Sequence, residues 1–212
     1  MTIEEKIELA KTSTSTKTLE KLSNDEDEDI RCNVACNKNT SPKTLDKLAN
    51  DKDSDVRCGV AWNENTSVET LDKLANDENK YVRYYLAKNE NTSVKTLDRL
   101  ADDEDYEVRC NVACNENTSL ETLDKLANDE EKLVRGRVAS NENTSPETLD
   151  KLADDEKCFV FNSVYNNPKT SKEILSKIEK RKKICFKCSF NNKNYKAINC
   201  PYKFEHEVLI GN

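Results

Sequence analysis

Four residues near the end of the sequence have the types and the spacing of metal ligands. Cys185 and Cys188 form a Cys-x-x-Cys pair, and Cys200 and His206 follow after gaps of eleven and five residues. A Cys-x-x-Cys pair places two thiolates on one tight turn, and a later cysteine and histidine can complete the tetrahedral coordination of Zn²⁺. The pattern therefore predicts a zinc site formed by these four side chains.

Two alternatives to zinc stay open. An iron–sulfur cluster would need a fourth thiolate, for which Cys158 is the nearest candidate. A metal-free cap is equally compatible, because the chain has nine cysteines and cysteine also serves as a small apolar side chain. The i, i+4 spacing of Cys32 with Cys36, and of Cys110 with Cys114, could also suit a metal, although the packing role is favoured there. Nine cysteines without an export signal predict reduced thiols in the cytoplasm.

The chain repeats itself every 26 residues. One unit reads Asn-Glu-Asn-Thr-Ser-x-x-Thr-Leu-Asp-x-Leu-Ala-x-Asp, followed by a short acidic stretch and then by Val-Arg-x-x-Val-Ala. A fixed period of this length is typical of a solenoid, in which each unit buries its apolar face against its neighbours. The arginine column shows the period most clearly, at Arg31, Arg57, Arg83, Arg109 and Arg135.

The first half of the unit has the pattern of a short helix. Leu71 and Leu74 are three residues apart and share one helix face. Thr66 is expected to cap this helix, with Glu69 reaching back to complete a capping box. The same pairing is predicted in three other units.

The second half of the unit has the pattern of a second short helix. Val56 and Val60 are four residues apart and form a buried stripe, with Asp51 or Asp53 as the expected N-cap. Each helix has only two or three turns and is too short to be stable alone. Stacking of the repeats must therefore supply the stability.

This pattern resembles the leucine-rich repeat variant family and, more distantly, HEAT repeats, over roughly residues 13–178. The resemblance implies a right-handed superhelix of paired short helices, with α and 3₁₀ turns alternating, and it implies no established activity. That family can carry an iron–sulfur cluster on an N-terminal cysteine segment, but residues 1–23 contain no cysteine, so this feature is not carried over. We predict an all-α, right-handed α-solenoid of about six 26-residue two-helix repeats. An N-terminal capping helix (1–12) should precede the repeats (13–178), and a basic, cysteine-containing cap (179–212) should follow them.

Positions that stay fixed from repeat to repeat should hold the stack together. Asp recurs with Arg in nearly every unit, which favours a ladder of Asp–Arg hydrogen bonds between repeats. A row of arginines that clamps an acidic partner is the alternative. The loop asparagines, at Asn37, Asn63, Asn89, Asn115 and Asn141, are predicted to form turns.

Positions that vary carry the evidence about binding. On the second helix, the positions of Asp29, Cys32, Asn33 and Cys36 share one face opposite the valines. Aromatic residues gather on this face in adjacent repeats, as is typical of binding hot spots, although they could instead fill gaps between repeats. The predicted partner-binding patch consists of Trp62, Tyr81, Tyr84, Tyr85 and Tyr106, with Lys88 and Arg137 at its rim.

Charge and composition narrow the class of function. The net charge of −7 divides into about −14 before residue 168 and +7 from there on, so the repeats should repel nucleic acid. One histidine and three isolated glycines argue against most histidine-dependent catalysis and against a Gly-rich phosphate loop. No apolar run approaches the length of a membrane span.

We therefore expect a cytoplasmic, monomeric, non-enzymatic scaffold that binds a protein or peptide. The alternatives are a nucleic-acid-associated protein that uses its basic C-terminal segment and an iron–sulfur redox adaptor.

Overall fold

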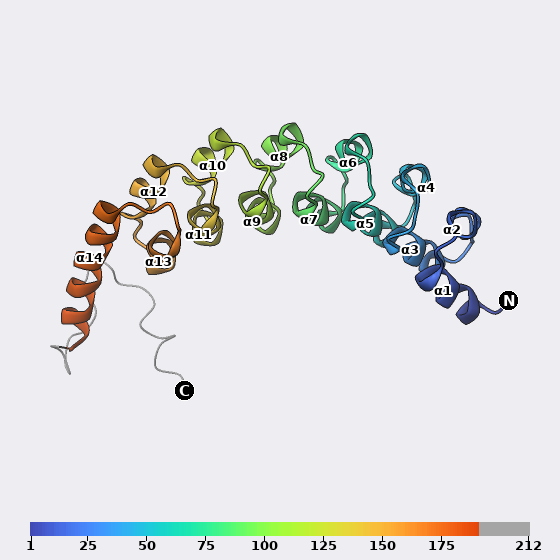
Figure 1. Cartoon of the computed structure of the whole chain (residues 1–212), viewed down its shortest axis with the longest axis horizontal. Helices are drawn as coiled ribbons and strands as arrows, with labels where there is room; N and C mark the ends of the chain where they lie inside the picture. The colour runs from blue at the N-terminus through green and yellow to red at the C-terminus, as the bar shows by residue number, and fades with distance from the viewer. Residues whose placement is uncertain (191–212) are drawn as a thin grey trace. The chain divides into compact units, whose positions relative to one another are not determined.

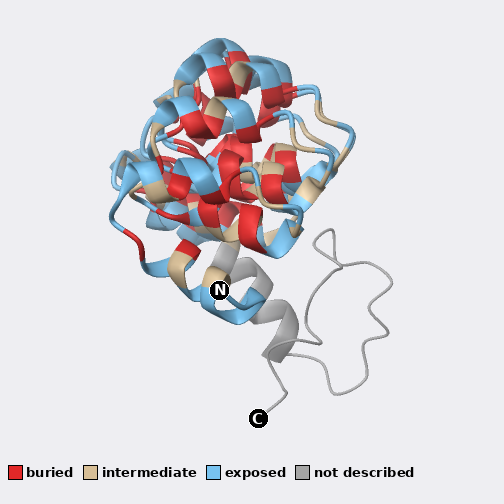
Figure 2. Cartoon of the chain, turned by 90° about the vertical axis from the view of Figure 1, so that its right-hand side faces the viewer, coloured by how far each residue is buried: buried red, intermediate tan, exposed pale blue. Residues whose placement is uncertain are grey.

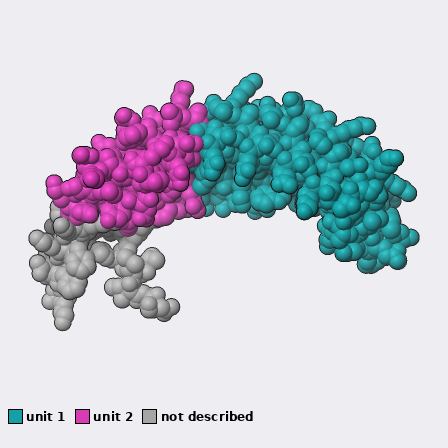
Figure 3. All heavy atoms as spheres, in the orientation of Figure 1, with its two compact units in different colours: residues 1–118 teal, residues 119–212 magenta. Residues whose placement is uncertain are grey.

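The computed structural model describes the backbone of residues 1–190 and the side chains of residues 1–181. This part of the chain contains fourteen helices and no strand, which confirms the all-α prediction. The chain divides into two compact units, Met1–Thr118 and Ser119–Asn212, which Figure 3 shows in different colours. Each unit is described by itself below.

Unit 1 begins with one helix and continues with four pairs of short helices. Within each pair, a first helix of seven residues precedes a second helix of nine residues. Consecutive second helices pack against one another, and α1 packs against the first of them. In Figure 1 the first and the second helices of this unit form two rows. The helices are α1 (Ile3–Thr12), α2 (Thr16–Leu22), α3 (Glu28–Cys36), α4 (Pro42–Leu48), α5 (Ser54–Trp62), α6 (Val68–Leu74), α7 (Lys80–Lys88), α8 (Val94–Leu100) and α9 (Tyr106–Cys114).

Unit 2 repeats the same pairing. Its second helices α11 and α13 pack against each other, as their counterparts do in unit 1. The solenoid architecture is therefore present in both units. The helices of unit 2 are α10 (Leu120–Leu126), α11 (Lys132–Ser140), α12 (Pro146–Leu152), α13 (Cys158–Asn166) and α14 (Lys172–Phe190).

Serine, and not threonine, caps the first helices. The Ser67 side chain accepts a hydrogen bond from the backbone N–H of Thr70, so α6 starts at Val68. The preceding Thr66 instead donates its hydroxyl to the carbonyl of Val60, at 2.7 Å, in the helix before. The predicted capping box of Thr66 with Glu69 is therefore wrong, because the helix begins one residue later.

Aspartate caps the second helices of unit 1 in most repeats. The Asp53 side chain accepts a hydrogen bond from the backbone N–H of Asp55 at 2.8 Å. Of the two predicted caps, Asp51 and Asp53, it is therefore Asp53 that caps α5. Asn79 has this role in α7. Asp51 is thereby left to contact the neighbouring repeat.

The core consists of the predicted leucine and valine stripes. In the repeat formed by α4 and α5, Leu45 and Leu48 of the first helix and Val56, Val60 and Ala61 of the second are all buried. The equivalent positions of the other repeats up to α13 are buried as well, except that the residue equivalent to Ala61 in α13 is the exposed Tyr165. Figure 2 shows the buried residues between the helices and the exposed residues on their outer faces. Short helices with one apolar face are thus stabilised by their neighbours.

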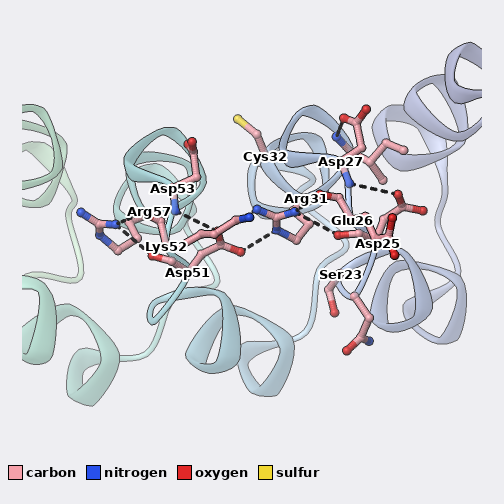
Figure 4. A network of polar contacts seen from close by, with 12 residues as sticks. Ser23, Asp25, Glu26, Asp27, Arg31, Cys32, Asp51, Lys52, Asp53 and Arg57 are labelled. Atoms are coloured by element: carbon pink, nitrogen blue, oxygen red, sulfur yellow. Dashed lines mark hydrogen bonds and ion pairs between the residues drawn. The ribbon is translucent and has the colours of Figure 1, made fainter.

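A ladder of arginine–aspartate pairs connects consecutive repeats (Figure 4). Arg57 donates from Nε and Nη2 to the two carboxylate oxygens of Asp77 in the next repeat, at 2.6 and 2.9 Å. Its Nη1 donates to the Asp51 and Lys52 carbonyls of its own loop. The predicted ladder is confirmed, and these arginines are occupied within the stack instead of clamping a partner. The same bidentate pairs join Arg31 to Asp51, Arg83 to Asp103 and, in unit 2, Arg135 to Asp155.

Each pair of the ladder stabilises the charged form of both groups. Burial alone raises the pKa of Asp77, but hydrogen bonds from the Arg57 side chain and the Asn79 backbone outweigh burial and hold this pKa below its usual value. The hydrogen bond to Asp77 raises the pKa of Arg57. Both groups therefore stay charged in the folded protein throughout the neutral range.

Loop asparagines form a second ladder. The Asn89 Nδ2 donates to the carbonyls of Ala61 and Asn63 in the preceding repeat, at 2.8 and 3.1 Å. Its Oδ1 accepts from the backbone N–H of Asn91, at 2.9 Å, as in an Asx turn. The predicted turn is confirmed, but the amide also bonds a carbonyl in the last helical turn of α5, which has no partner in its own helix. The same bonds recur at Asn37, Asn63, Asn115 and, in unit 2, Asn167.

We predict that the repeat is a removable unit. Deletion of Asn63–Lys88 joins two equivalent positions, so the remaining helices can restore both ladders, and circular dichroism should show a folded, helical protein. Deletion of the half-repeat Asn63–Ala75 is the control, because it should bring non-equivalent faces together and unfold the stack. Loss of helical structure in the first variant would contradict the solenoid.

The arginine–aspartate ladder predicts a specific loss of stability. Asp77→Asn leaves the nearly buried Arg57 without its counter-charge, which should lower the free energy of unfolding by about 3 kcal/mol at pH 7. The pKa of Asp77 is lower in the folded protein than its ordinary value of about 4. The ion pair therefore stabilises the parent fully above about pH 4, and this stability is lost as the pH falls through the pKa of Asp77 in the folded protein. Urea denaturation at pH 7 and about pH 3 should therefore show a smaller difference between parent and variant in acid. The exposed Glu69→Gln is the control, and a constant difference at both pH values would contradict the ladder's role.

Candidate functional site

The second helices of unit 1 present two exposed rows of side chains that cross the stack. The second residue of each helix forms one row, which we call the second-residue row, and the last residue forms the other, the last-residue row. Because these helices pack side by side, equivalent residues lie on the same face. The second-residue row consists of Asp29, Asp55, Tyr81 and Glu107, and the last-residue row consists of Cys36, Trp62, Lys88 and Cys114, all of them exposed.

Three of the predicted aromatic rings are exposed on the second helices, and Trp62, Tyr85 and Tyr84 form a chain of ring contacts. Trp62, Tyr81 and Tyr106 are 51%, 55% and 40% exposed. The rings of Trp62 and Tyr85 contact edge to face with centroids 5.8 Å apart, and Tyr84 and Tyr85 do so at 5.3 Å. The half-buried Tyr85 therefore supports the exposed indole ring, which gives the patch a fixed shape.

Basic side chains lie directly over two of the exposed rings. The Lys88 Nζ is 4.9 Å from the centroid of Trp62, and the Lys80 Nζ is 5.3 Å from that of Tyr81. Both distances fall within the range of cation–π attraction. The exposed rings of this face are thus suited to cationic groups.

The middle positions of the predicted face are less exposed than expected. Tyr84 and Tyr85 are half-buried, and Gly59 at an equivalent position is buried. A Cβ atom on Gly59 would lie 2.9 Å from the Cβ of Ala35 and 3.0 Å from the Sγ of Cys36, so α5 approaches α3 too closely for a larger side chain. These positions lie between neighbouring helices, which agrees with the alternative in which side chains of this face fill gaps between repeats.

A shallow hollow of about 390 Å³ adjoins the patch. Its lining includes Trp62, Lys88, Cys36 and Lys38, together with loop asparagines. An aromatic wall surrounded by polar groups can hold an apolar side chain of a bound peptide and form hydrogen bonds with the peptide's backbone. The hollow thus extends the patch at the C-terminal ends of α3 and α5.

The remaining predicted rim residue, Arg137, lies in unit 2. It is exposed on α11. The same face of unit 2 exposes Leu133, which the repeat comparison also places there, and Phe159, which the sequence reasoning missed. Phe159 is one period after Leu133, in the position that Tyr81 has in unit 1, so comparing repeats past residue 155 would have found it.

The predicted zinc site is not tested by the structure. Cys185 and Cys188 lie on the helical backbone of α14, but their side chains are outside the described residues, as are Cys200 and His206. Among residues with described side chains, no group of three histidine, cysteine or acidic side chains could hold a metal ion. Cys158, the candidate fourth ligand of an iron–sulfur cluster, is half-buried at the start of α13.

The Cys32–Cys36 pair on α3 differs chemically from the nearby Cys58. A hydrogen bond with Cys32 lowers the pKa of the exposed Cys36 to about 7, and the same contact raises the pKa of Cys32. Burial raises the pKa of the nearby Cys58 to about 11. One thiol of this group, Cys36, is therefore about half ionised near pH 7.

Comparisons with known proteins give a structural likeness only. No family model matches the sequence, and no curated protein matches it. Among solved structures, "a leucine-rich repeat variant with a novel repetitive protein structural motif" is similar, with a TM-score of 0.63 and 26% identity over 85% of this chain and 76% of that chain. An engineered protein (TM-score 0.30, 17% identity, 83% and 88% covered) and a designed armadillo repeat protein in complex with the peptide (KR)4 (TM-score 0.26, 15% identity, 94% and 88% covered) also match.

The paired helices and their two ladders define a helical repeat protein. Within this class, the repeat is similar to that of the leucine-rich repeat variant, which confirms the resemblance predicted from the sequence. In residues 1–190, each helix is too short or too polar to cross a membrane.

We predict that Cys36 is more reactive than Cys32 and Cys58 near neutral pH. Alkylation by iodoacetamide, followed residue by residue with mass spectrometry, should reach half its maximal rate near pH 7 for Cys36 and near pH 11 for Cys58. Cys32→Ala removes the hydrogen bond and should raise the midpoint of Cys36 by about one unit or more, toward the usual thiol pKa. Cys58→Ala is the control that leaves this midpoint in place. An unchanged midpoint in Cys32→Ala would refute the pairing.

Proposed function

We propose that the chain is a non-enzymatic scaffold, with its repeats in residues 13–178, that binds a protein or peptide partner through the exposed face of its second helices. The observation that carries the proposal is the exposure of three large rings, Trp62, Tyr81 and Tyr106, on consecutive second helices. Exposed aromatic side chains that gather on a rigid surface are typical of interface hot spots. Lys88 lies at the rim of this patch in unit 1, and Arg137 has the equivalent function on unit 2.

The support beneath the rings favours binding over packing alone. Tyr84 and Tyr85 are held half-buried between helices, and Tyr85 braces Trp62 through an edge-to-face contact. Rings that are already fixed lose little conformational entropy when a partner covers them. The patch is therefore prepared to contribute binding energy.

A nucleic-acid partner is less compatible with this face. Residues 1–167 carry a net charge of about −14, and the second-residue row exposes three carboxylates. Phosphate groups would be repelled there. The basic segment that could contact nucleic acid, and the cysteines that could hold zinc, lie at or beyond the end of the described side chains.

We predict that single substitutions in the patch abolish partner capture without unfolding the protein. Trp62→Ala or Tyr84→Ala should weaken binding by about 2 kcal/mol or more, roughly thirtyfold, because truncation of a hot-spot ring removes its contact area. A tagged full-length protein, with each variant beside it, would be used to retrieve the partner from a lysate of the source cells.

The control for this experiment is Val94→Ala. Val94 is an exposed apolar residue at the start of the first helix α8, outside the patch. It should retain the partner as the parent does, and circular dichroism should show that all three variants are folded. Retention of the partner by Trp62→Ala and Tyr84→Ala, or unfolding of both, would make the patch a structural feature.

A further inference from the structure

The second-residue row of unit 1 combines carboxylates with an exposed ring. Asp29, Asp55 and Glu107 lie in the same row as Tyr81, and all four side chains are exposed. In the part of the chain with described side chains, neither Asp29 nor Asp55 forms an ion pair. Two carboxylates of the row are therefore available to an external cation.

The chain's own Lys80 shows how this row holds an ammonium group. Its Nζ lies 2.9 Å from the Oδ2 of Asp105, 3.7 Å from the Oε2 of Glu107 and 5.3 Å from the ring centroid of Tyr81. Two carboxylates and one aromatic face thus surround a single positive charge. Tyr81 and Glu107 of the row, together with the adjacent Asp105, therefore hold a lysine side chain in a geometry that an incoming lysine or arginine could use.

We propose that the second-residue row binds an extended, basic segment of a partner protein, with a lysine or arginine side chain at about every third position. The inference rests on the proposed function and specifies the chemistry of the partner. Charge complementarity between the exposed carboxylates and the basic segment would align the segment across the helices.

The spacing of the repeats sets the spacing of the cations. Packed helices lie about 8–10 Å apart, so equivalent residues of α3, α5, α7 and α9 recur at about that distance. A polyproline II segment rises about 3.1 Å per residue and returns to the same side every three residues, or about 9.3 Å. Side chains at positions i, i+3 and i+6 would therefore meet Asp29, Asp55 and the pair of Tyr81 and Glu107 in turn.

The test is calorimetric titration of the full-length protein with short synthetic peptides. The first peptide has lysine at every third position, the second has the same composition with its lysines consecutive, and the third has glutamate in place of lysine. The first should bind most tightly, the third should not bind, and the affinity of the first should fall as ionic strength rises.

Two sets of variants test the residues involved. The triple variant Asp29→Asn, Asp55→Asn, Glu107→Gln should weaken binding of the first peptide about tenfold. A control triple variant removes the same charge from exposed residues of α1, α2 and α6, by Glu8→Gln, Glu20→Gln and Glu69→Gln, and should bind nearly as the parent does.

Removal of the internal lysine should have the opposite effect. Lys80→Ala frees the carboxylates of Asp105 and Glu107 and should tighten peptide binding about threefold. Lys95→Ala removes the same charge from the exposed side of α8 and should leave the affinity nearly unchanged. This gain of affinity cannot arise from unfolding, so it tests the row even if the triple variant is unstable.

Three results would overturn the proposal. The first is equal binding of the glutamate peptide, and the second is unchanged affinity in both the triple variant and Lys80→Ala. The third is concentration-dependent self-association that the triple variant abolishes, which would assign the row to a second copy of the chain. Each of these results leaves the aromatic patch intact, because capture of the partner by the parent and its loss in Trp62→Ala are measured separately.

Discussion

An asparagine follows each second helix of unit 1, and its side-chain amide bonds carbonyl groups at the end of the helix that packs against that second helix in the preceding repeat. This bond fixes the position of each repeat against its neighbour. A helix of nine residues leaves its last carbonyls without partners, and burial makes that loss costly. Asn89 satisfies one of them in α5 while its own oxygen fixes the turn that leads into α8. One side chain therefore couples the end of one helix to the start of the next repeat.

The two ladders separate the residues that hold the stack from those that contact solvent. The ladders use one arginine within each second helix and the loop positions before and after that helix, and the apolar core uses its valine stripe. The second-residue and last-residue rows take part in neither. Their side chains can differ from repeat to repeat, and they do, from Cys36 through Trp62 to Lys88. A regular stack can thus carry an irregular surface, which is what specific recognition of a partner requires.

Much of this organisation could be predicted from the sequence, because each repeat is an independent observation of the same local structure. Recurring arginine and aspartate predicted the ladder, and recurring leucine and valine predicted the core. The failures have tertiary causes. Thr66 and Ser67 are both good caps, and the choice between them depends on the carbonyl of Val60, which no local pattern places nearby. Gly59 is buried because a neighbouring helix approaches it, and Phe159 was missed because the repeat pattern weakens beyond residue 155.

The ladders also have a direction. In unit 1 each of Arg31, Arg57 and Arg83 donates to an aspartate of the following repeat, whereas each loop asparagine donates to carbonyls of the preceding one. The two sides of a repeat are therefore different surfaces, and the interface between repeats is heterologous. The side toward the following repeat offers arginine donors and helix-end carbonyls, and the side toward the preceding repeat offers aspartate acceptors and asparagine donors. A twofold axis brings identical surfaces together, so it would place arginine opposite arginine and asparagine opposite asparagine, away from their partners. The bonds that build the stack consequently cannot serve a symmetric pairing of two chains.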